Sequence, residues 1–150
     1  MKRNKAAAAA VGALLLITVV VALIHIQSRV PAREGALQIE ADGQTVELVL
    51  KELEPQEVRG VVVNGKGEER TIEAQGVPLS QVLDRAGIVK YAQVTVVADD
   101  EYSAVVTQEE AEEPERVFLL LEEGEQPQLL VFGDANSKRN VSGVIRMIVQ

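Results

Sequence analysis

The stretch Gly76-Val-Pro-Leu-Ser-Gln-Val-Leu-Asp-Arg-Ala-Gly-Ile88 decides the fold, because it carries more helix start and stop signals than any other part of the chain. Pro78 suits the first helical position, where its missing N–H is tolerated, and Gly87 suits the left-handed residue that ends many helices. Apolar residues recur between them at helical spacing, at Leu79, Val82, Leu83 and Ala86. The stretch therefore predicts a short helix with one buried face.

Runs rich in β-branched residues lie on both sides of this helix. Before it, the turn Asn64-Gly65-Lys66-Gly67 joins two extended segments and predicts a β-hairpin. After it, residues 93–98 and 102–107 flank Asp99-Asp100-Glu101 and predict a second hairpin. We expect the helix to pack on a sheet with inner residues that include Val61, Val63, Val94, Val96, Leu119, Leu121, Val131, Ile145 and Met147.

The remaining segments complete a mixed pattern. Residues 37–41 read as a strand turned by Asp42-Gly43, and Thr45 is expected to cap a helix that runs to Leu53 and stops before Pro55. Residues 108–115 predict a surface helix or loop, and 117–121, 129–132 and 144–149 predict strands. Many short strands with two or three short helices, and no regular βαβ alternation, predict the α+β class.

The N-terminal region is apolar and precedes this pattern. Residues 6–26 form an unbroken run of 21 residues whose only polar members are Thr18 and His25. A helix of that length spans a bilayer, so we expect a transmembrane helix at 6–27, a cytoplasmic N-terminus at 1–5, a linker at 28–36 and the folded domain at 37–150. Lys2, Arg3 and Lys5 place that domain outside the cytoplasm by the positive-inside rule. A signal peptide cleaved near Val30-Pro31-Ala32 is the alternative.

Composition excludes several functions. The chain contains no cysteine, so neither a thiolate metal ligand nor a thiol nucleophile exists. Residues 37–150 carry 10 basic and 22 acidic residues, a balance of −12, which disfavours binding to nucleic acid. The glutamates between 109 and 125 lack the interleaved Asp, Asn and Gly of a calcium loop, so they predict a solvated acidic face.

From about Leu37 to Val149, the chain resembles the molybdopterin-binding domain of the sulfite oxidase family in its short bacterial form. Three pieces carry the resemblance: the Gly76 to Ile88 stretch, Val96-Val-Ala-Asp-Asp-Glu-Tyr-Ser103, and the segment from Gly133-Asp to Ile148 with its basic residues. The resemblance implies a mixed, β-rich fold and an oxidoreductase in which a cysteine ligates molybdenum and basic side chains hold the pterin phosphate. Here Asn64 occupies the position of that cysteine, Glu101 that of a glycine, and Ser142 that of an expected lysine.

By this resemblance the candidate cofactor-binding residues are Asn64, Asp99, Tyr102, Ser103, Lys138 and Arg139. No catalytic residue and no metal ligand are predicted, because an amide is a poor substitute for a thiolate on a soft metal. We expect no cofactor, although the resemblance allows molybdopterin to bind without its metal ligand.

Three functions follow. The first is a non-catalytic, membrane-anchored extracytoplasmic module that binds a ligand or partner protein. The second is an active molybdopterin-dependent oxidoreductase, and the third is a structural accessory subunit of a membrane redox complex.

Overall fold

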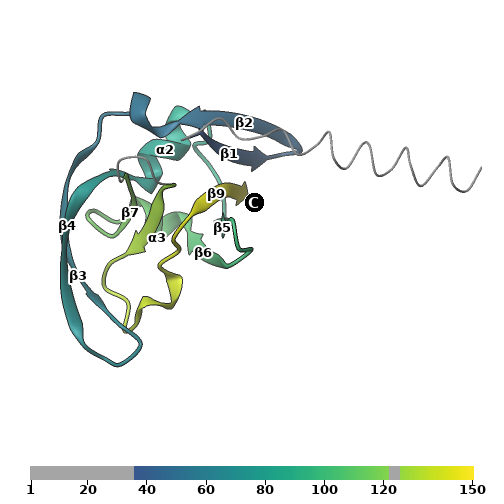
Figure 1. The fold of residues 1–150 in the computed structure, drawn as a ribbon. Coiled ribbons are helices and arrows are strands. Elements are labelled where there is room, and N and C mark those ends of the chain that lie inside the picture. The colour runs from purple at the N-terminus through teal and green to yellow at the C-terminus, as the bar shows by residue number, and fades with distance from the viewer. Residues whose placement is uncertain (1–35, 122–125) are drawn as a thin grey trace, which may run out of the picture. The chain divides into compact units, whose positions relative to one another are not determined.

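The computed structural model describes residues 36–121 and 126–150 (Figure 1). The predicted transmembrane helix at 6–27 and the cytoplasmic segment at 1–5 lie outside these residues, as does the linker up to residue 35. Within the described ranges, no helix is long and apolar enough to cross a membrane.

Nine strands form two sheets in this part of the chain. The first sheet has the order β2-β1-β9-β5-β6, with β1 and β9 parallel and the other neighbours antiparallel. Its strands are β1 (Ala36–Ala41), β2 (Gln44–Val49), β5 (Gln93–Ala98), β6 (Ser103–Thr107) and β9 (Val144–Val149). The second sheet is antiparallel, in the order β3-β4-β7-β8. Its strands are β3 (Gln56–Val63), β4 (Glu69–Pro78), β7 (Val117–Leu120) and β8 (Gln128–Val131).

The helical elements are short. They are α2 (Leu79–Arg85), α3 (Gln108–Glu112) and two single 3₁₀ turns, η1 (Leu50–Glu52) and η2 (Ser137–Arg139). The helix α2 confirms the prediction from the 76–88 stretch: Leu79, Val82 and Leu83 are fully buried, and Gly87 takes a positive φ of 81° just after the helix. Because Pro78 ends β4 and directly precedes α2, this stretch joins the second sheet to the helix.

The predicted α+β class is wrong, because the described residues are dominated by the two sheets. The helix expected from Thr45 to Leu53 is instead β2 followed by η1. Its apolar residues also fit a period of two, and Val46 and Leu48 lie opposite Ile39 and Leu37 of β1. Asp42 and Gly43 between the strands both have positive φ, at 50° and 74°, so the Asp-Gly pair forms a hairpin turn that fixes this strand pairing.

The main core contains the buried side chains of α2 and of both sheets. It confirms Val94, Val96, Leu119, Val131 and Met147 as inner residues. Val61 was predicted to be buried, but it is 47% exposed. The reason is the pleat of β3, in which Val58 and Val62 face inward and Val61 faces outward.

A second cluster lies on the other face of the second sheet. Its buried members are Val58, Phe118, Leu120, Leu130 and Phe132, and the rings of Phe118 and Phe132 meet edge to face at 6.0 Å. Figure 1 shows that β3 and β4 form a long curved hairpin along the outside of the molecule. Space for the Phe132 ring comes from Gly60 of β3, because a Cβ built there would lie 2.5 Å from Cε1 of Phe132. This cluster therefore depends on a glycine in the middle of a strand.

Candidate functional site

Three of the six candidate residues lie in or beside the turn that joins β5 to β6. The Ala98 N–H donates to the Tyr102 carbonyl at 2.8 Å, and the Tyr102 N–H donates to Asp100 Oδ1 at 3.0 Å. Glu101 has a φ of 68°, the left-handed conformation that glycine adopts most easily. The Asp99 N–H donates to the Gly143 carbonyl at 3.0 Å, and Ser103 begins β6 with an exposed side chain.

The turn η2 supplies two further candidates, Lys138 and Arg139, and lies against the β5–β6 hairpin. The Asn136 side chain accepts from the Lys138 N–H at 3.1 Å and caps the turn. The Tyr102 hydroxyl donates to the Lys138 carbonyl, and Arg139 Nη1 donates to the Val105 carbonyl at 3.3 Å. The structure thus brings Tyr102, Lys138 and Arg139 together, although the contact to Lys138 is through its backbone. The Lys138 side chain is exposed.

The guanidinium of Arg139 is enclosed by acceptors. Its Nε and Nη2 donate to the two oxygens of Asp134 at 2.7 and 2.6 Å. Its Nη1 and Nη2 donate to the two oxygens of Glu110, both at 2.8 Å. With the bond to the Val105 carbonyl, all five N–H donors of the guanidinium have acceptors within the protein. No donor of Arg139 remains for a phosphate.

Arg116 completes this group of charges, which we call the ion cluster: Glu110, Arg116, Asp134 and Arg139. Arg116 Nη2 lies 3.2 Å from Glu110 and 3.8 Å from Asp134. All four side chains are between 16% and 29% exposed, so solvent screens their charges only in part. The cluster holds α3 against the loop between β8 and η2.

The ion cluster shifts the titration of its members. The hydrogen bonds from Arg139 lower the pKa of Glu110 to about 2, with further contributions from the Thr107 backbone and the charge of Arg116. The bonds to Asp134 and Glu110 raise the pKa of Arg139 above its usual value. Glu110 also closes a capping box, because it accepts from the Thr107 N–H while its own N–H donates to Thr107 Oγ1.

Asn64 belongs to a different turn, the one between β3 and β4. Its Oδ1 accepts from the N–H groups of Lys66 and Glu68, both at 2.9 Å, and its Nδ2 donates to Glu68 Oε2 at 2.7 Å. Its backbone N–H donates to the Glu68 carbonyl. Every hydrogen bond of its side chain is therefore made within its own turn, and among the described residues none joins it to the other five candidates.

Four surface depressions formed by described residues lie elsewhere. One of about 490 Å³ is lined by residues of η1 and α2 and of the segment after η1, among them Glu52, Glu54 and Asp84. Others of about 280, 350 and 300 Å³ lie beside Gln44, Tyr91 and Pro114. None of these four is lined by a candidate residue. In the part of the chain that the structure describes, no group of three or more His, Asp or Glu side chains has the arrangement of a metal site.

Tyr91 is a titratable group that the sequence analysis did not select. Its hydroxyl is buried and has no hydrogen-bond partner among the described residues. Burial raises its pKa, as do the nearby carboxylates of Glu112 and Asp84. Its backbone N–H donates to Gln108 Oε1 at 3.0 Å, so the residue joins the loop after α2 to the start of α3.

Sequence reasoning missed the acidic half of the ion cluster. Glu110 was assigned to a solvated acidic face, although the pattern Thr107-x-x-Glu110 is a local signal for a helix cap. Asp134 was not selected either, although Arg139, which donates to both of its carboxylate oxygens, follows it by only five residues.

Comparison of the chain with known protein families and with curated proteins finds no match in either set. The functional interpretation therefore depends on the residues and their geometry.

Proposed function

We propose that this protein is a non-catalytic, membrane-anchored extracytoplasmic module whose folded part binds a ligand or a protein partner. The observation that carries the proposal is the saturation of Arg139. The residue expected to grip a pterin phosphate directs all five donors at Glu110, Asp134 and the Val105 carbonyl. Binding a phosphate there would require breaking at least one charge-assisted hydrogen bond, which costs on the order of 1.5 to 3 kcal/mol.

The surroundings of the candidate residues also disfavour an anionic cofactor. Asp99, Asp100 and Glu101 lie in the turn next to Tyr102, and the domain as a whole carries −12. Asn64 stands where the resemblance puts a metal-ligating cysteine, but its amide serves the β3–β4 turn. These features weigh against an anionic redox cofactor at these residues and support the non-catalytic part of the proposal.

Metal analysis tests the absence of catalysis. The full chain is expressed in a host that makes molybdopterin, as wild type and as Asn64→Cys, with Thr45→Cys on β2 as a control for metal held by any exposed thiol. We expect no stoichiometric molybdenum in any of the three. About one molybdenum per wild-type chain would overturn the proposal. Metal gained by Asn64→Cys alone would show that the hairpin turn can reach a cofactor held elsewhere.

The anchor is proposed from the apolar run at 6–26 and the three basic residues that precede it. Protease added to intact spheroplasts tests this part. We expect the domain to be digested without lysis. Protection until lysis would place the domain in the cytoplasm.

A pterin-binding module without the metal is the second candidate. It is favoured by the contact between Tyr102 and Lys138, since both residues belong to motifs that carry the resemblance. Acid extraction of purified protein, followed by fluorescence detection of oxidised pterin, distinguishes the two functions. We expect no pterin above the level found with a protein that binds none.

A further inference from the structure

Of the four edge strands of the two sheets, two are covered by other segments of the chain and two have no neighbouring strand among the described residues. The outer edge of β6 is contacted by η2, where Arg139 donates to the Val105 carbonyl. The outer edge of β8 is bridged by Val141, which exchanges two backbone hydrogen bonds with Leu129, at 2.8 and 3.1 Å. The edges of β2 and β3 have no neighbouring strand among the described residues. Exposed edges of this kind can pair with a strand of another chain.

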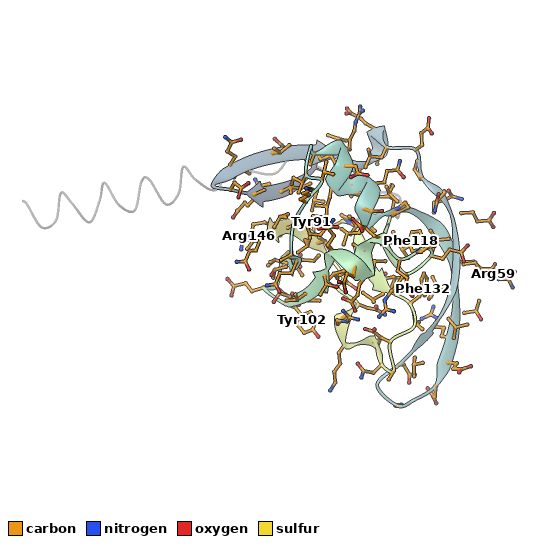
Figure 2. All side chains as sticks on the ribbon, turned by 180° about the vertical axis from the view of Figure 1, so that it is seen from behind. Arg59, Tyr91, Tyr102, Phe118, Phe132 and Arg146 are labelled. Carbon is orange, nitrogen blue, oxygen red and sulfur yellow. The ribbon has the colours of Figure 1, made fainter. Side chains whose placement is uncertain are left out.

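The β3 edge combines length with opposite charges on one face. Glu57, Arg59 and Val61 point outward from this strand of 8 residues, and Val61 is 47% exposed. Arg59 Nε lies 3.0 Å from Glu73 Oε1 on the neighbouring strand β4. Figure 2 shows Arg59 on the outer side of the curved hairpin, directed away from the rest of the molecule. The β2 strand differs, because Glu47 is its one charged residue.

We propose that two copies of this chain associate by antiparallel pairing of their β3 strands, with Val58 on the twofold axis. In this register, Glu57 of each copy lies opposite Arg59 of the second copy. The twofold axis makes two such cross-strand ion pairs. Each Arg59 then lies between Glu73 of its own chain and Glu57 of the other, so charges alternate across three adjacent strands.

The same charges disfavour the neighbouring registers. Pairing centred on Arg59 would place the two guanidinium groups directly opposite each other. Pairing centred on Gly60 would place Glu57 opposite Val63 and Arg59 opposite Val61, with no opposite charge on either. In the favoured register, the paired segment is residues 56–60. Its last residue, Gly60, is the one on which Phe132 packs. For β2, no symmetric register places Glu47 opposite a cation.

Cysteine cross-linking tests the register, because the chain has no native cysteine. Two differently tagged full-length copies are co-expressed, one with Glu57→Cys and one with Arg59→Cys, and then oxidised. We expect a disulfide-linked pair that contains both tags. Each variant expressed alone, and Thr45→Cys on β2, should give a much weaker product. No mixed product, or equal cross-linking by any of these controls, would overturn the proposal.

Charge reversal provides a second measurement on a different property. In Glu57→Lys, the introduced lysine of each copy lies opposite Arg59 of the other copy, so both ion pairs become repulsive. We expect self-association of the purified chain to weaken by about tenfold. Adding Arg59→Glu to this variant restores opposite charges, and association should recover. Both positions are exposed, so the fold should tolerate the changes. Equal association of wild type, single and double variants would show that β3 pairing does not hold the dimer.

Discussion

The main core and the second cluster bury similar side chains but obtain their space in different ways. The main core is filled by side chains of α2 and by alternating strand residues of both sheets. In the second cluster, two phenylalanine rings pack against the curved β3–β4 hairpin, and Gly60 makes room for one of them. The first arrangement follows from periodicity along the chain. The second requires a missing side chain at one position, so the two clusters should respond differently to substitution.

The largest effect is expected in the main core. Leu83 is 0% exposed, and Leu83→Ala removes its packing against a region that cannot fully collapse. We expect the free energy of unfolding in urea to fall by about 2 to 5 kcal/mol. A change within measurement error would mean that α2 does not pack as the structure shows. Val89→Ala, at a residue that is 66% exposed, is the control and should change stability little.

The second prediction concerns the ion cluster, whose Asp134 lies two residues after Phe132 of the second cluster. The pKa of Glu110 is about 2 in the folded chain and 4.5 as its ordinary value. A lowered folded pKa stabilises the fold above pH 4.5, and this contribution is lost as the pH falls toward 2. Its size is on the order of 2 to 3 kcal/mol, allowing for partial exposure.

Glu110→Gln isolates that contribution. The variant should be less stable than wild type at pH 7, and the difference should shrink as the pH falls from 5 toward 2. Urea unfolding at several pH values measures both. Glu109→Gln, at the exposed neighbouring residue, is the matched control and should leave the pH profile unchanged. Parallel profiles for wild type and Glu110→Gln would rule out this titration as a source of stability.

The third prediction breaks the second cluster directly. A methyl group at Gly60 would lie 2.5 to 2.8 Å from three atoms of the Phe132 ring, so the ring or the strand must move. We expect Gly60→Ala to cost about 1 to 3 kcal/mol. In Gly60→Ala/Phe132→Ala the clash is absent, so the double variant should lose less than the sum of the single losses. Additive losses would mean that Gly60 and Phe132 are not in contact.

Much of the fold was predictable because its signals are local. The Asn64 to Gly67 turn and the proline and glycine around α2 each specify their own neighbourhood. The Thr45 segment fits a helix by its sequence because its apolar residues satisfy both periods, and the Asp42-Gly43 turn is what pairs it with β1 as a strand. The contact of Gly60 with Phe132 joins residues far apart in sequence, and no local pattern indicates it.

In the candidate site, too, some features can be predicted from the sequence and others cannot. Arg139 could be selected from sequence because it is basic and lies in a recognisable segment. Its contact with Glu110 could not be predicted, since that carboxylate lies 29 residues away in α3 and only the fold brings it to η2. Asp134, in contrast, lies only five residues before Arg139. The pattern of residue types therefore selected Arg139 as a candidate but did not indicate the acceptors that its side chain binds.

The smallest effect is expected at the tip of the β3–β4 hairpin, and it tests whether the second cluster depends on its turn. Asn64→Ala removes three side-chain hydrogen bonds, all at an exposed site, so we expect a loss of about 1 kcal/mol. Asn64→Asp is the matched variant: it keeps an acceptor for the Lys66 and Glu68 N–H groups but places a carboxylate beside that of Glu68. Amide hydrogen exchange should show faster exchange in β3 and β4 for Asn64→Ala, while α2 and β5 stay protected. If exchange rises equally in α2, the hairpin and the main core unfold as one unit, and the contrast between the two clusters is one of packing alone.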